Sequence, residues 1–219
     1  MTRARSLLDR DLAGLMDRTQ QLCSMVLEAL DRSMQALHTR DVQLARRVID
    51  HDREINALRY QIEEECLRTL ATQQPAASDL RLIIATTHIA VELERMGDHA
   101  ASIADVVQRM AEEDQILSLH KLPKMAKHAN RMVKKSIDAF LLRDAEMALT
   151  VTRREEKIDK HYDTLFHETL GEMQSEDYIQ RATFLLWVGR HLERVGDRAT
   201  NIAERVVFMV RGEFIELGE

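Results

Sequence analysis

The sequence predicts an all-α protein made of two tandem three-helix bundles. Of its 219 residues only 7 are Gly and 2 are Pro, and aromatic residues make up 4%, so few positions favour turns or strands. Apolar residues recur in steps of three and four, as they do in helices that pack side by side. A segment of twelve residues also occurs twice, which indicates that one helical unit has been duplicated.

The duplicated segment begins at Leu93 and again at Leu192. It reads Leu-Glu-Arg-Met-Gly-Asp-His-Ala-Ala-Ser-Ile-Ala in the first half and Leu-Glu-Arg-Val-Gly-Asp-Arg-Ala-Thr-Asn-Ile-Ala in the second, with eight identical positions. The second copy starts 99 residues after the first. The duplication predicts two domains of the same fold, residues 1–115 and 116–219.

Three helices are expected in the first half. Thr39 to Asp41 offer a cap between the first two helices, and Pro75 marks the end of the second. A seam with heptad spacing runs along the third helix and predicts coiled-coil-like packing. The expected helices cover 5–38, 41–73 and 78–111. The seam consists of Leu82, Thr86, Ile89, Leu93, Met96, Ala100, Ile103, Val107 and Met110.

The second half repeats this pattern. Arg143-Asp144 matches Arg40-Asp41 as a cap, and Pro123 lies near the start of the fourth helix. The seam recurs along the last helix and is apolar except at its first position. The expected helices cover 120–142, 145–173 and 177–211. The seam consists of Arg181, Leu185, Val188, Leu192, Val195, Ala199, Ile202, Val206 and Met209.

Each copy of the duplicated segment carries two acids four residues apart, on the side of the helix opposite the seam. These pairs are Glu94 with Asp98 and Glu193 with Asp197. Carboxylates at this spacing repel each other, and Arg95 and Arg194 are expected to point elsewhere on the helix. A solvated surface is one interpretation, because acids are frequent in this chain. Their recurrence at matched positions favours a binding role.

The second helix of each half carries a related pair. These pairs are Asp52 with Asn56 and Glu155 with Asp159. On neighbouring antiparallel helices, such pairs would present oxygen ligands to a cation, and bridging carboxylates suit two metals about 3.5–4 Å apart. Mg, Ca, Mn, Fe and Zn all accept such ligands. Asn56 lacks the charge of its counterpart Asp159, so the first site is expected to be the weaker.

Other kinds of site find no support in the sequence. Ferritin-like di-iron sites need Glu-x-x-His on two helices, and no His here has a Glu three residues before it. His51, His99 and His161 lie close to the acid pairs in sequence and are interpreted as surface residues. There is no Gly-rich phosphate loop, nucleophile elbow or catalytic Cys/His pairing. The sequence therefore predicts no enzymatic activity.

Composition restricts the partners and the compartment. A formal net charge of −6 argues against nucleic-acid binding, which needs a positive field. Cys23 and Cys66 suggest buried free thiols in a reducing cytoplasm. Charges interrupt the N-terminal apolar run before it reaches the length of a signal peptide, and no stretch approaches the roughly 20 apolar residues that span a bilayer.

The motif Leu-Glu-Arg-x-Gly-Asp in both halves, with the segment from Pro75 to Arg81 before the third helix, resembles the PhoU family. The resemblance covers essentially the whole chain. It implies a cytoplasmic negative regulator of phosphate uptake and of the phosphate regulon. Such a regulator restrains the high-affinity phosphate ABC transporter, through its ATPase subunit, and the associated sensor histidine kinase when phosphate is plentiful.

The resemblance also implies multinuclear metal clusters, of iron or zinc, on the bundle surface. Carried over to this sequence, the implied ligands of the second site are Glu155, Asp159, Glu193 and Asp197, and those of the first are Asp52, Glu94 and Asp98. Two alternatives stay open. The carboxylates could serve metal storage or phosphohydrolase chemistry, or the protein could be a metal-free helical scaffold.

The start of the third helix offers one candidate for partner contact. Asp79 and Arg81 are expected to contact a partner, the alternative being that Ser78 or Asp79 simply caps the third helix.

Phe184 and Trp187 are expected in the core rather than at an interface. Ile84 and Val91 lie on the side of the third helix opposite the seam, and their exposure favours a homodimer.

Overall fold

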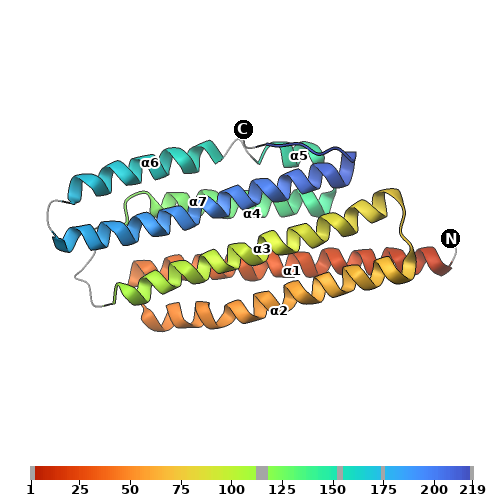
Figure 1. The fold of residues 1–219 in the computed structure, drawn as a ribbon, viewed down its shortest axis with the longest axis horizontal. Helices are drawn as coiled ribbons and strands as arrows, with labels where there is room; N and C mark the ends of the chain where they lie inside the picture. The colour runs from red at the N-terminus through yellow and green to blue at the C-terminus, as the bar shows by residue number, and fades with distance from the viewer. Residues whose placement is uncertain (1–2, 112–117, 152–154, 174–175, 218–219) are drawn as a thin grey trace.

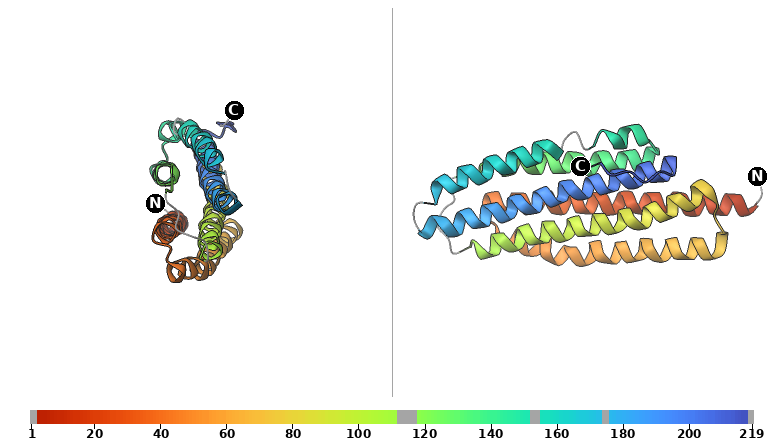
Figure 2. Two further views of the ribbon diagram at one scale, coloured as in Figure 1. Left: turned by 90° about the vertical axis from the view of Figure 1, so that its left-hand side faces the viewer. Right: turned by 45° about the horizontal axis from the view of Figure 1, so that its top comes forward.

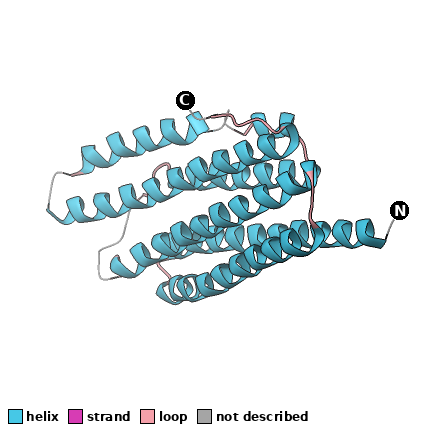
Figure 3. Ribbon diagram, turned by 45° about the vertical axis from the view of Figure 1, so that its right-hand side comes forward, coloured by secondary structure: helices cyan, strands magenta, loops and turns pink. Residues whose placement is uncertain are grey.

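The computed structural model describes residues 3–111, 118–151, 155–173 and 176–217. These residues form seven α-helices, and no strand occurs among them (Figure 3). The predicted all-α class is confirmed, whereas the predicted domain boundary between 115 and 116 lies outside the described residues. The helices are α1 (Arg3–Thr39), α2 (Val42–Gln73), α3 (Ala77–Arg109), α4 (Leu122–Leu142), α5 (Ala145–Leu149), α6 (Glu155–Glu172) and α7 (Glu176–Arg211).

The helices form two elongated bundles that lie side by side (Figure 1). Helices α1, α2 and α3 pack together in one bundle, and α4, α6 and α7 in the other, with α5 against α7. The bundles meet where α3 contacts α7 and where α1 contacts α4. Seen along the bundle axis, α1 and α4 share one side of the molecule and α3 and α7 share the other (Figure 2).

The helix starts of the two halves match in detail. Arg40 and Arg143 adopt left-handed backbone conformations, with φ of 54° and 51°. The carboxylates that follow them cap the next helix: Asp41 accepts a hydrogen bond from the Leu44 amide and Asp144 from the Met147 amide, each at 2.9 Å. Both predicted caps are thereby confirmed, because each satisfies an amide that has no partner within the helix.

The fifth helix is shorter than expected. The prediction of one helix over 145–173 is wrong, because α5 ends at Leu149 and α6 begins at Glu155. At the break the Thr150 amide bonds to Met147 O (3.1 Å) and the Val151 amide to Ala148 O (2.9 Å), which is the tighter three-residue pattern. The Thr150 hydroxyl also donates to Met147 O at 2.7 Å, and both β-branched residues disfavour helix. Val151 is fully buried, so the turn directs it into the core.

The third helix starts differently from the expected cap. Neither Ser78 nor Asp79 is its N-cap, because Ala76 occupies that position and makes no side-chain cap bond. Asp79 lies in the first turn, where a negative charge is favourable next to the helix dipole, and it is buried.

Both heptad seams lie in the core, as predicted. Every member in the first half is buried, and in the second half all are buried except Arg181. The two cysteines are free and buried, also as expected.

The glycine of each duplicated segment allows close helix contact. A Cβ at Gly97 would lie 3.1 Å from Ile55 Cγ2, and one at Gly196 would lie 2.9 Å from Ile158 Cδ1. Ile55 and Ile158 occupy matched places on α2 and α6. In both bundles, therefore, the glycine of the duplicated segment lets its helix pack closely on the preceding one, α3 on α2 and α7 on α6. The two halves thus share this packing as well as the sequence motif.

Candidate functional site

The first acid cluster forms between α2 and α3. Asp52 and Asn56 come from α2 and are joined by a hydrogen bond from Asn56 Nδ2 to Asp52 Oδ2 at 3.0 Å. Burial raises the pKa of Asp52, and the charge of Asp98 on α3 raises it further, while the bond from Asn56 opposes the shift. The helices thus bring the predicted residues of the first site within electrostatic reach of each other.

Glu94 completes this cluster. Burial raises the pKa of Glu94, and the charge of Asp98 raises this pKa further. Arg59 lowers it, because Arg59 Nη2 lies 3.7 Å from Glu94 Oε1. Burial also raises the pKa of Asp98, with Arg198 as the main opposing charge. Loss of contact with water is thus the main reason why all three carboxylates are harder to ionise here than in solution.

The second acid cluster forms between α6 and α7. Burial raises the pKa of Asp159, and the charges of Glu193, Asp197 and Asp163 raise it further. The predicted ligands Asp159, Glu193 and Asp197 therefore lie close enough to influence one another's charge, and so does Asp163. The side chain of Glu155, the fourth predicted ligand, lies outside the described residues.

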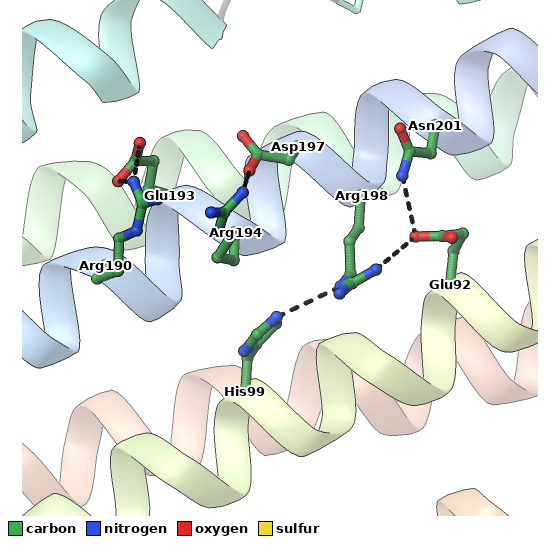
Figure 4. A network of polar contacts seen from close by, with 8 residues as sticks. All are labelled: Glu92, His99, Arg190, Glu193, Arg194, Asp197, Arg198 and Asn201. Carbon is green, nitrogen blue, oxygen red and sulfur yellow. Dashed lines mark hydrogen bonds and ion pairs between the residues drawn. The ribbon is translucent and has the colours of Figure 1, made fainter.

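Arginines neutralise part of the second cluster (Figure 4). Arg190 Nη1 donates to both carboxylate oxygens of Glu193 at 2.6 Å, and Arg194 Nη1 donates to Asp197 Oδ2 at 2.9 Å. The expectation that Arg194 points elsewhere is wrong. Both pairs have a spacing of three residues along one helix, a signal in the sequence that could have revealed them.

The first cluster offers oxygen atoms that nothing in the described structure satisfies. Asp52 Oδ1 and Asn56 Oδ1 are buried without a hydrogen-bond partner. Buried polar atoms are normally paired, and oxygen ligands of this kind suit a hard cation. The donor set therefore fits a metal. Among the described residues, however, no three His, Cys, Asp or Glu side chains converge closely enough to hold one as they stand.

A polar network that the sequence did not reveal joins the two bundles at the contact of α3 with α7 (Figure 4). Arg198 Nε donates to His99 Nε2 at 3.3 Å. His99 Nδ1 also lies 3.2 Å from Nδ1 of His191, which is not drawn in the figure. Arg198 Nη1 and Asn201 Nδ2 both bond to Glu92 Oε2, at 3.0 and 3.3 Å. The duplication offers one signal for this contact, because Arg198 matches His99 and His191 matches Glu92 at the offset of 99 residues. These residues face each other only once the bundles dock.

Burial, the neighbouring His191 and Arg198 together lower the pKa of His99 to about 4. His99 is half-buried between the bundles, so its interpretation as a surface residue is wrong. His51 and His161 are half-buried too: His51 pairs with Glu54 at 2.9 Å, and the His161 ring lies 5.4 Å from that of His128.

Asp79 and Arg81, the two residues expected at a partner interface, are buried and half-buried in this structure. Arg81 Nε donates to Met209 O at 3.2 Å, which ties the start of α3 to the end of α7. Asp79 is buried. Contact of either residue with a partner stays a prediction.

The aromatic expectation holds for one residue and fails for the other. Phe184 is buried, but Trp187 is 45% exposed, so its assignment to the core is wrong. Ile84 is 37% exposed and Val91 is half-buried, which leaves the homodimer a prediction.

The arrangement matches a known family in both halves. A family model described as the PhoU domain matches residues 19–107 and again residues 122–206. The chain belongs to the PhoU family. Each match covers one acidic segment and all but the last residue of one seam, so the family resemblance of the sequence is confirmed.

Relatives and solved structures agree with this assignment. A phosphate-specific transport system accessory protein PhoU homolog of Pseudomonas aeruginosa is 37% identical over 190 residues, covering 86% of this chain and 78% of the relative. The accessory protein PhoU of Escherichia coli is 31% identical over 205 residues, covering 93% and 85%. The crystal structure of the phosphate transport system regulatory protein PhoU from Streptococcus pneumoniae superposes with a TM-score of 0.89 at 35% identity, covering 96% of this chain and all of that one.

The family is thus one of phosphate transport accessory proteins, and this chain has a role in regulating phosphate transport. In the described part of the chain, no helix has the length and apolar character needed to span a membrane.

Proposed function

We propose that this PhoU protein is a cytoplasmic negative regulator of phosphate uptake and of the phosphate regulon. It binds the ATPase subunit of the high-affinity phosphate ABC transporter and the associated sensor histidine kinase when phosphate is plentiful, shifting their conformational equilibria. The observation that carries this proposal is that both halves match a family whose curated relatives are named as accessory proteins of phosphate transport. We infer no enzymatic role.

Gene deletion in the source organism tests the proposal. Under phosphate sufficiency, deletion is expected to raise phosphate uptake and regulon expression, and the intact gene is expected to restore both. Pull-down with the purified ATPase subunit and with the kinase, at high and low phosphate, separates the two partners. Unchanged uptake and expression in the deletion strain would remove the basis for the regulatory role.

We further propose that the acid clusters bind metal. Asp52, Glu94 and Asp98, with the amide oxygen of Asn56, would hold it in the first cluster, and Asp159, Glu193 and Asp197, with Glu155, in the second. A cation would favour the ionised forms of these carboxylates, which burial disfavours. The unsatisfied oxygens of Asp52 and Asn56 support the first site. In the second cluster Arg190 occupies both oxygens of Glu193 and Arg194 occupies Oδ2 of Asp197, so these arginines would compete with a metal for the carboxylates.

Elemental analysis of protein purified without chelator tests the metal proposal. Iron or zinc is expected to be retained by the wild type and reduced in Glu193→Ala/Asp197→Ala. The matched control is Asp17→Ala/Glu28→Ala, which removes two exposed acids from α1. The first cluster has one acid fewer than the second, so metal is expected to dissociate from it more readily. Metal titration of Asp197→Ala, which leaves the first cluster intact, and of Asp98→Ala, which leaves the second intact, would measure the difference. Absence of metal under varied loading would leave a helical scaffold.

The runner-up functions share the same clusters. Turnover of phosphate esters by metal-loaded protein, lost in Asp197→Ala, would favour phosphohydrolase chemistry over regulation. Sedimentation of the wild type and of Ile84→Glu tests the homodimer, because a dimer formed through that face of α3 should dissociate when the face is charged.

A further inference from the structure

An apolar groove lies between α1 and α4. These two helices form the side of the molecule away from α3 and α7 (Figure 2). Its volume is about 700 Å³. Its apolar wall comes from side chains that pack on the core but stay half-buried: Leu27, Met34, Leu119 and Ala126. Here the two bundles contact each other without closing the space between them.

The groove has the dimensions of a helical segment. On α1 its lining extends from Leu27 to His38, and on α4 from Pro123 to Lys134. At 1.5 Å per residue, each wall is about 16 Å long, or roughly three helical turns. The lining residues recur at helical spacing on both walls, so the groove offers two parallel ridges to a third helix.

The charge of the rim is opposite to that of the protein. Lys127, Arg131 and Lys134 are exposed along the α4 edge. Among the described residues that line the groove, Asp31 is the only carboxylate, and it accepts a hydrogen bond from Asn130 Nδ2 at 2.6 Å. The formal net charge of the chain is −6, yet α4 carries five Lys or Arg and a single acid, Asp138. An occupant that complements this groove is therefore apolar on one face and acidic beside it.

We propose that the groove binds an acidic amphipathic helix of a partner protein, about three turns long. The apolar face of such a helix fits the wall of the groove, its acids pair with Lys127, Arg131 and Lys134, and its polar face remains in water. A lipid acyl chain fits less well, because the exposed rim would leave one side of the chain in water. This inference rests on the groove alone and is independent of phosphate regulation.

Binding to synthetic peptides tests the proposal with the purified full-length protein. The probe is a peptide of about 11 residues, the three turns that the groove holds, with Leu at helical spacing flanked by Glu, and its counterpart has Lys in place of each Glu. Fluorescence anisotropy is expected to show that the Glu peptide binds at least about ten-fold more tightly than the Lys peptide. Lys127→Glu/Arg131→Glu should weaken the Glu peptide about ten-fold, whereas Arg46→Glu/Arg47→Glu, on exposed positions of α2, should leave it within about two-fold.

Circular dichroism of each variant controls for folding, and Lys127→Gln/Arg131→Gln gives an intermediate loss if charge is responsible. Equal binding of both peptides, no binding of the Glu peptide, or no effect of the groove variants would overturn the proposal. Binding of dodecanoate to the groove without binding of the peptide would assign it to lipid instead. A homodimer that Lys127→Glu/Arg131→Glu dissociates would assign it to a second copy of this chain. All of these outcomes are independent of any effect on phosphate uptake.

Discussion

Replacement of Gly97 by alanine tests the close packing of α2 on α3. The added Cβ would lie 3.1 Å from Ile55 Cγ2, 3.2 Å from Ile55 Cδ1 and 3.3 Å from Asp52 Oδ1. The Cγ2 methyl sits directly on the branched Cβ of a fully buried isoleucine, so it cannot move aside without a change of rotamer or a shift of α2. Gly14, in α1, is the matched control, because a Cβ there meets nothing within 4 Å.

Two opposing effects set the magnitude. Alanine is favoured over glycine in a helix interior by about 1 kcal/mol, and this gain applies at both positions. Overpacking of a core typically costs about 1–3 kcal/mol, and it applies only at Gly97. With roughly 2 kcal/mol of overpacking, Gly97→Ala should lose about 1 kcal/mol of unfolding free energy, while Gly14→Ala should gain about 1 kcal/mol.

Thermal unfolding by circular dichroism, with chelator present, provides the assay. For a chain of this size about 1 kcal/mol corresponds to roughly 2–4 °C, so Gly97→Ala should melt about 3 °C below the wild type and Gly14→Ala about 3 °C above it. Equal stabilisation by both substitutions would refute the close approach at Gly97. Equal destabilisation would mean that the loss does not come from packing against Ile55.

Three further outcomes are expected. Leu192→Asp places an unpaired charge in the buried seam of α7 and should cost about 3–5 kcal/mol in urea unfolding; a loss below about 1 kcal/mol would contradict the seam assignment. Metal-free Glu193→Ala/Asp197→Ala should keep its melting temperature within about 3 °C, because exposed ion pairs contribute about 1 kcal/mol or less, and a larger drop would show that the acids are structural. The folded protein holds the pKa of His99 at about 4, so as pH falls the unfolded chain is protonated at this residue before the folded protein is. The stability that His99 contributes above its ordinary pKa of 6.5 is therefore lost as pH falls toward 4. The urea midpoint should therefore fall less between pH 7 and pH 5 in His99→Gln than in the wild type, and equal falls would contradict the pKa shift.

Local signals account for most of the fold that could be predicted. The seams through Leu93 and Leu192 follow from heptad spacing, and the Asp41 and Asp144 caps follow from a carboxylate placed just before a helix. The sequence does not reveal the break after Leu149, because the matched residues of the first half continue as the single helix α2 and the duplication predicts the same for the second half. Local hydrogen bonding at Thr150 and burial of Val151 outweighed that symmetry.

The candidate site was predictable in its members but not in their environment. Spacing alone places Glu94 with Asp98 and Glu193 with Asp197 on one helix face each, and pairs them with acids of the preceding long helix. Spacing does not give the desolvation that raises the pKa of Asp52, nor the buried oxygens left without partners. Those properties depend on how closely α2 approaches α3 at Gly97, which is a tertiary distance.

By itself, the sequence determined that this chain is helical, duplicated and equipped with an acidic pair in each copy of its motif, because helix periodicity and capping act over a few residues. Only the tertiary structure decided how the two copies meet. The His99–His191 contact, the Arg198–Glu92 pair and the groove between α1 and α4 all join residues about 90 to 110 positions apart. Docking of the bundles brings polar groups together where α3 contacts α7 and leaves a groove where α1 contacts α4. No pattern within a single helix encodes that difference.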